Sequence, residues 1–273
     1  MKNYLVYPCK VMRITQSYDG RTSHLPHTTG SPKDYPIDEA CRDSGREGFY
    51  CPCDEMKLVI KYGQGNGGTN TLFLQSTSKV VFADGTSDYV SVQVTHPNDS
   101  DLRKLTKGQK FKRGELICSE GSDGGVGNHL HISAGKGKIR GNGWVKNSKG
   151  KWVLNCTKGA CKPQQLFFVN SAFTKVIHSK GLVFRFLPEE KYTAGTYKVS
   201  EATLLYVRKG PGTNYGKKKY ISFTSSAKKQ IKELVGRKVD GYVKGVVFTV
   251  TETDGVWGKT PSGWVCLDYC RKI

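Results

Sequence analysis

A short glycine-rich stretch that ends in two histidines limits what this chain can fold into more than any other feature. Residues 121–128 include four glycines and run into His129-Leu130-His131, which is predicted to begin a short β-strand. Residues two apart on a strand point to the same side of its sheet, so both imidazoles should face one space. Neutral imidazole is a good Zn²⁺ ligand, and a neighbouring histidine can act as an acid or base. The tripeptide alone fits equally well two solvent-exposed histidines on a strand of a binding protein.

The composition indicates a mainly β chain with an anionic partner. The chain has 273 residues, enough for one large domain or two modest ones, each with its own core. Its 32 glycines, and polar runs that alternate with Val, Ile, Tyr and Phe, are typical of antiparallel β structure. Lys and Arg number 43 against 23 Asp and Glu, a net charge of +20. Such an excess suits nucleic acid, an anionic membrane or an anionic wall polymer, and charge alone does not choose among them.

Two of these partner classes are disfavoured by other patterns. Basic and aromatic residues do not alternate on one predicted strand face, as they do in binders of RNA or single strands, so we expect no nucleic-acid partner. No apolar run approaches transmembrane length, and residues 1–9 lack the apolar segment of a signal peptide. We therefore expect no membrane insertion, synthesis in the cytoplasm, and a separate exit route for any action outside the cell.

The cysteines do not define a metal site by their spacing. There are nine, an odd number, so at least one thiol stays unpaired within a monomer. Cys41, Cys51 and Cys53 cluster, but Cys51-Pro-Cys53 is not the usual finger spacing, and three cysteines supply only three ligands. Buried free thiols are favoured over a structural zinc or a disulfide, and the oligomeric state is left open.

The hydrophobic pattern predicts two domains joined by a linker. Alternating apolar residues in the first part predict strands or hairpins over residues 11–16, 57–62, 71–75, 80–82, 88–96, 107–117, 144–152, 163–173 and 175–186. A polar stretch with Pro and Gly follows, and then short strands resume over 203–212, 246–250, 256–259 and 263–265, with one helix over 226–235. We predict an N-terminal antiparallel domain over 1–187, a linker over 188–195 and a small β-barrel over 196–273.

Further polar residues stand at the ends of the predicted strands. In the strand over 88–96, alternation places His96 on the same face as Val90, Val92 and Val94, and the strand end delivers it to a loop mouth. A polar loop over 21–33 carries two more histidines, and Asp38 follows it.

These residue types suit a catalytic metal. A carboxylate, an imidazole from the loop and an imidazole from a distant strand are three protein ligands, which leave Zn²⁺ a fourth position for water. The metal would lower the pKa of that water and polarise a substrate carbonyl. Two further histidines could carry protons during hydrolysis of an amide.

The order of these residues resembles the LytM/lysostaphin-type M23 peptidases, zinc endopeptidases that cut peptide cross-links in bacterial cell walls. The resemblance covers roughly residues 10–185. Its motifs are Gly-Asn-His-Leu-His after a Gly-Gln-x-x-x-x-Gly-Glu-Leu-Ile hairpin, with Ser-His and Ile-Asp upstream. The resemblance implies His24, Asp38 and His131 as zinc ligands, and His129 and His96 as the residues that handle protons.

Two features of this resemblance bear on the site. The fourteen positions between His24 and Asp38 exceed the short gap usual in the family, so His27 is an alternative ligand. His24 is favoured because Ser-His follows a Tyr-x-Gly turn. The family often has a Tyr shortly before its first His, which makes Tyr18 a candidate for contacting the substrate oxyanion.

The last part of the chain resembles bacterial SH3 (SH3b) domains. Leu205-Tyr-Val-Arg-Lys-Gly-Pro-Gly-Thr-Asn-Tyr215 is similar to their signature turn, and Trp257-Gly-Lys and Gly263-Trp-Val are similar to their paired Trp strands. A long basic insert over 217–245 departs from the pattern. The resemblance implies binding to wall peptides or glycans, and the 15 basic against 6 acidic residues from Lys198 onward suit an anionic wall.

We therefore predict a peptidoglycan hydrolase: a Zn²⁺-dependent endopeptidase that cleaves stem or cross-bridge peptides and is targeted by its C-terminal SH3b domain. A wall-cutting domain without a signal peptide indicates a phage or prophage endolysin released through a membrane hole. The alternative is a non-catalytic wall-binding or regulatory protein of the same fold.

Overall fold

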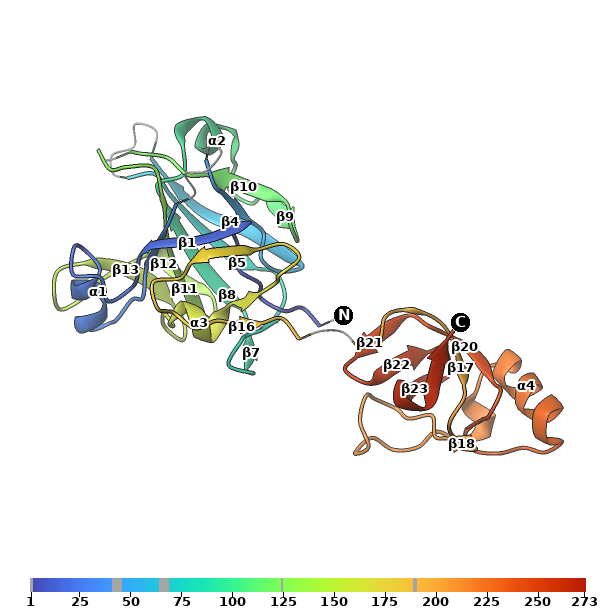
Figure 1. The fold of residues 1–273 in the computed structure, drawn as a ribbon. Coiled ribbons are helices and arrows are strands. Elements are labelled where there is room, and N and C mark those ends of the chain that lie inside the picture. Colours follow the sequence, from blue (N-terminus) through green and yellow to red (C-terminus); the bar gives the residue numbers. More distant parts are fainter. Residues whose placement is uncertain (1, 41–45, 64–68, 124, 189–190) are drawn as a thin grey trace. The chain divides into compact units, whose positions relative to one another are not determined.

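The computed structural model describes residues 2–40, 46–63, 69–123, 125–188 and 191–273. The chain is mainly β, with 41% of residues in strands and 12% in helices, which confirms the predicted fold class. It forms two compact units, residues 2–187 and residues 188–273 (Figure 1). Within the described part of the chain, no helix is long and apolar enough to cross a membrane.

The described part of the unit over 2–187 is built from short strands with three short helices. Its helices are α1 (Leu25–Thr29), α2 (Asp99–Lys104) and α3 (Pro163–Leu166). Its strands are β1 (Val11–Gln16), β2 (Ile37–Glu39), β3 (Gly48–Tyr50), β4 (Glu55–Tyr62), β5 (Thr71–Ser76), β6 (Val80–Val81), β7 (Ser87–Asp88), β8 (Val90–Thr95), β9 (Lys110–Lys112), β10 (Leu116–Ser119), β11 (Leu130–Lys136), β12 (Ile139–Lys146), β13 (Trp152–Cys156), β14 (Phe168–Val169), β15 (Lys175–His178) and β16 (Arg185–Phe186).

Eight of these strands form one sheet, in the order β15-β1-β2-β11-β8-β5-β4-β9. All neighbours in it are antiparallel except β1 and β15. The order places β2, β11 and β8 side by side at the centre, although β2 and β11 are far apart in the sequence. The sheet therefore brings the Asp38 segment next to the His129-Leu130-His131 segment.

The two faces of this sheet have different chemistry because side chains alternate along each strand. Val90, Val92 and Val94 on β8, and Leu130 and Ile132 on β11, lie in the main hydrophobic core. The opposite face carries polar and aromatic residues, which include Thr71, Phe73, Gln93, Thr95 and His131. Part of that face is covered by the β12–β13 hairpin, where Trp144 packs edge-on against Phe73 at 5.0 Å between ring centroids.

The position predicted for His96 by alternation is wrong. Strand β8 ends at Thr95, and His96 has a φ of 66°, in the left-handed region. This backbone conformation breaks the period of two, so His96 leaves the valine face. It lines the same groove as Gln93 and Thr95 on the opposite side of the sheet.

Two segments predicted as loop or strand are helical. The polar loop over 21–33 contains α1 with Pro26 in its first turn, and the segment over 163–173 begins with α3 instead of a strand. In α3, Pro163 occupies the first turn, where its missing N–H costs no hydrogen bond, and Gln165 Oε1 accepts from Lys162 N.

The unit over 188–273 has a separate core. Its strands are β17 (Gly195–Val199), β18 (Leu204–Leu205), β19 (Tyr242–Val243), β20 (Val247–Val250), β21 (Glu252–Asp254), β22 (Trp257–Thr260), β23 (Gly263–Cys266) and β24 (Cys270–Lys272). Its helices are α4 (Ser225–Val235) and the 3-10 turns η1 (Tyr220–Ser222) and η2 (Leu267–Tyr269). The strands form small sheets in the orders β20-β17-β24, β18-β19 and β21-β22-β23.

The basic insert over 217–245 contributes α4 to this second core. Thr224 caps the helix by accepting from Ala227 N, and Gly236 ends it with a φ of 68°. Ala227 and Ile231, four residues apart, are buried against the core, while Lys229 is exposed. The strand predicted over 203–212 is wrong in extent, because only Leu204–Leu205 pairs as a strand before the chain turns.

The structure describes eight of the nine cysteines. Cys41 lies outside the described residues, and the remaining eight cysteines are free. Cys51 and Cys53 are buried. Among the described residues, they form no disulfide.

Candidate metal centre

Strand register places Asp38 and His131 directly opposite each other. Asp38 on β2 pairs with His131 on β11, and His131 pairs on its other side with Thr95 of β8. Directly opposite residues on neighbouring strands share a face and lie in contact distance. His131 Nδ1 is accordingly 3.1 Å from Asp38 Oδ1. The second carboxylate oxygen of Asp38 accepts a 2.9 Å hydrogen bond from Gln16 Nε2, which holds the carboxylate in this orientation.

His24, the residue that precedes α1, lies next to Asp38 and His131. Its side chain is buried, and its Nδ1 is 2.9 Å from the carbonyl oxygen of Ser17. A carbonyl only accepts hydrogen bonds, so Nδ1 carries the proton and Nε2 keeps its lone pair. Nε2 lies 3.2 Å from Asp38 Oδ1 but is a buried nitrogen without a hydrogen bond. This orphaned nitrogen, with the opposite nitrogen tied to a carbonyl, is the usual state of a metal-ligating histidine.

Three donor atoms therefore converge on one point. One nitrogen each from His24 and His131 and one oxygen from Asp38 lie within 4.8 Å of one another. Burial acts to raise the pKa of Asp38, but the His131 and His24 rings outweigh it and hold that pKa well below its usual range. Two imidazoles and an ionised carboxylate are a donor set that suits Zn²⁺ with a remaining open position.

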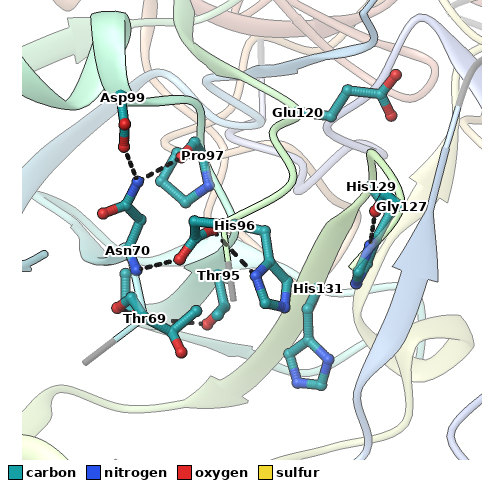
Figure 2. A network of polar contacts seen from close by, with 12 residues as sticks. Thr69, Asn70, Thr95, His96, Pro97, Asp99, Glu120, Gly127, His129 and His131 are labelled. Carbon is teal, nitrogen blue, oxygen red and sulfur yellow. Dashed lines mark hydrogen bonds and ion pairs between the residues drawn. The ribbon is translucent and has the colours of Figure 1, made fainter. Parts of the chain in front are cut away.

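His129 and His96 lie beside this cluster. His129 Nε2 is 3.6 Å from Asp38 Oδ1, and its Nδ1 is 2.7 Å from the carbonyl oxygen of Gly127. The His96 and His129 ring centroids are 4.6 Å apart, and Figure 2 shows both rings close to His131. Burial, with the neighbouring His129, lowers the pKa of His96 against the opposing effect of Asp123.

His27 lies near the cluster without joining it. Its ring centroid is 6.1 Å from that of His131, and it lines the neighbouring groove. Burial, aided by His131 and His24, lowers the pKa of His27 to about 4. The three converging donors include His24, whereas the His27 nitrogens lie outside that set.

Two other residues from the early loops lie outside the cluster. Asp34 is buried, and its carboxylate accepts from Tyr35 N and Leu154 N, so it fastens the loop to β13. Tyr18 packs edge-on against Tyr35, and its hydroxyl accepts a 3.3 Å hydrogen bond from Gln164 Nε2. The role expected for Tyr18 with the substrate stays a prediction.

A groove of about 480 Å³ opens beside His96 and His131. Its polar floor includes Thr71, Gln93 and Thr95, and its aromatic wall is formed by Tyr62, Trp144 and Trp152. Trp152 keeps 55% of its surface exposed. A polar floor with an exposed aromatic wall is suited to an elongated substrate that presents both amides and apolar groups.

Asp123 contacts a candidate site residue, and no motif in the sequence indicates it. It follows two residues after Gly121 in the glycine-rich stretch, and its Oδ1 is 3.1 Å from His96 Nδ1. The aromatic wall was not identified either. No sequence pattern indicates Asp123 or the aromatic wall, because loops and strand pairing across the sheet are what bring them near the histidines.

The site can be set beside proteins of known structure. No protein-family model matches the chain, and no curated protein matches it. Eleven chains of solved structure match. One is a zinc-containing peptidase from Vibrio cholerae, at 18% identity and a TM-score of 0.31, which covers 49% of this chain and 36% of that one. The present chain thus spans about a third of that peptidase.

Two other matches are structures of lysostaphin. The solution structure of lysostaphin is 14% identical, with a TM-score of 0.31. The match covers 85% of this chain and 80% of the lysostaphin chain. The antimicrobial peptidase lysostaphin from Staphylococcus simulans is 16% identical, with a TM-score of 0.29, covering 84% and 78%. At identities and TM-scores this low, the likeness carries no functional argument.

Proposed function

We propose that this chain is a zinc-dependent endopeptidase that cleaves stem or cross-bridge peptides of bacterial peptidoglycan. The observation that carries the proposal is the convergence of His24 Nε2, Asp38 Oδ1 and His131 Nδ1, next to two further histidines and an open groove. His24, Asp38 and His131 would hold the zinc ion. When bound, zinc would acidify a water molecule and polarise the carbonyl of the scissile amide.

The two histidines beside the converging donors, His129 and His96, each keep a lone pair on one defined nitrogen. Nδ1 of His129 is tied to the Gly127 carbonyl, so its Nε2, on the side of Asp38, keeps a lone pair. Nδ1 of His96 faces Asp123, which leaves Nε2 as the second acceptor. We assign these two nitrogens to take the proton of the attacking water and return it to the departing amine.

The groove and the second unit support a wall polymer as the substrate. An extended peptide can lie along the polar floor of the groove, with its apolar groups against Tyr62, Trp144 and Trp152. In the unit over 188–273, a cavity of about 490 Å³ is lined by basic residues and Trp264. Its basic lining suits an anionic wall, and we propose an SH3b-type binding role for this unit. We also propose a phage or prophage origin for the enzyme.

A combined metal and cleavage experiment tests this proposal. Purified protein should contain about one zinc per chain, should reduce the turbidity of wall suspensions, and should lose that activity with a chelator. Mass spectrometry of the released fragments should show newly formed peptide amino termini. A metal-free protein that leaves walls intact but still binds them would instead favour the non-catalytic wall-binding protein.

A further inference from the structure

Beyond the five residues of the proposed centre, one acidic side chain is built into the site. Asp123 lies on the glycine-rich stretch, and its side chain is 21% exposed. Its two carboxylate oxygens have different partners. Oδ1 is 3.1 Å from His96 Nδ1, and Oδ2 accepts a 2.7 Å hydrogen bond from the backbone N–H of Asn70.

Asn70 holds both partners of this contact. Its backbone oxygen accepts from His96 N at 2.9 Å, and its side-chain Nδ2 donates to Pro97 O at 3.1 Å and to Asp99 Oδ1 at 2.7 Å (Figure 2). The residue thus binds the chain on both sides of His96 while it orients Asp123. The left-handed φ of 66° at His96 is strained for a residue with a side chain, and these contacts offset that strain.

The contact with Asp123 determines which nitrogen of the His96 ring carries the proton. A carboxylate only accepts, so the Asp123 contact favours a proton on Nδ1 and leaves the lone pair on Nε2. Asp123 and Asn70 line a separate cavity from the groove that His96 and His131 line. The carboxylate therefore approaches His96 from the side away from the groove.

We infer that Asp123 is a positioning residue that fixes the tautomer and orientation of His96, so that Nε2 of His96 serves the reaction in the groove. The inference rests on the proposed peptidase function. The glycine-rich stretch that leads to His129 and His131 would then also carry the group that orients His96, the residue directly after β8. Asp123 is not one of the three converging donors, and its contact with the site residues named above is the one with His96 Nδ1, so we assign its effect to His96.

Direct observation of the ring separates this role from a merely structural one. In full-length protein with ¹⁵N-labelled histidine, long-range ¹H–¹⁵N spectra should show His96 protonated on Nδ1. Asp123→Ala should abolish this single tautomer and lower kcat on soluble peptidoglycan fragments by about 10- to 100-fold, with KM and zinc content unchanged. The control variant is Asp19→Asn, which removes the same charge from an exposed aspartate and should change none of these quantities.

Asp123→Asn is the isosteric variant if the alanine variant folds poorly. Its single amide oxygen can accept from His96 or from Asn70 N but not from both, so an intermediate kcat is expected. Wild-type His96 protonated on Nε2, or Asp123→Ala with wild-type kcat, would overturn the inference. A wild-type protein that binds no zinc and cleaves nothing would instead overturn the proposed function, while the tautomer measurement would still report on the Asp123–His96 contact.

Discussion

Replacing Asp38 with Asn tests the convergence of the three donors most directly. Asp38 Oδ1 lies 3.2 Å from His24 Nε2 and 3.1 Å from His131 Nδ1, and it is the only anionic atom of the trio. Asp38→Asn keeps the shape of the side chain and removes the charge. Two neutral imidazoles and a weakly donating amide would remain for the metal.

The expected loss follows from the number of ligands. Zinc sites with four protein ligands bind with apparent free energies of about 10–16 kcal/mol, so one ligand contributes on the order of 3 kcal/mol. Loss of the carboxylate should therefore weaken zinc binding by about 100-fold. Because bound metal stabilises only the folded state, the rise in melting temperature on adding zinc should shrink as well.

Competition against a chromogenic chelator measures this affinity, and Asp123→Asn is the matched control. Asp123 is another partly buried aspartate beside a histidine, with a side chain 21% exposed against 14% for Asp38. The control should keep wild-type zinc affinity. Equal affinity in Asp38→Asn and wild type, or an equal loss in both variants, would refute the assignment of Asp38 as a ligand.

Three further predictions concern residues around the same site. His129→Ala and His96→Ala should keep their zinc but lose turnover by about 100- to 10,000-fold, and an emptied metal site in His129→Ala would contradict this division of roles. His24→Ala should lose zinc in elemental analysis, whereas His27→Ala should keep it, and the reverse result would make His27 the ligand. Burial raises the pKa of Glu39 to about 8 from 4.5, so the folded state binds the extra proton and stability should fall as the pH rises. Between pH 6 and 8 the free energy of unfolding, measured with urea, should fall by about 2 kcal/mol. Glu39→Gln should remove most of this fall. An unchanged dependence of the unfolding free energy on pH in the variant would count against the role of Glu39.

The strand pattern shows how far local sequence predicts this fold. Val90, Val92 and Val94 alternate with polar residues, and all three lie in the main hydrophobic core, because alternation separates the two faces of a strand. The alternation does not reveal that Ser91, Gln93 and Thr95 on the other face are buried as well. The same rule fails at His96, since the backbone there is held by Asn70, which lies 26 positions earlier, directly before β5. In a similar way, the segment over 163–173 is predicted as strand from its apolar residues, but it begins with a helix because Pro163 suits the first helical turn.

The sequence by itself determined the inventory of this protein: its mainly β character, its excess of positive charge, and the order of the histidines and the aspartate. Only the tertiary structure decided which nitrogen of His24, His96 and His129 keeps its lone pair. It also decided that His24 converges with Asp38 while His27 stays outside, and that Asp123 faces His96. The physical reason is that Asp38 and His131 are 93 positions apart and meet only through the register of β2 with β11. That register is set by packing of the whole sheet, which no local pattern of residues records.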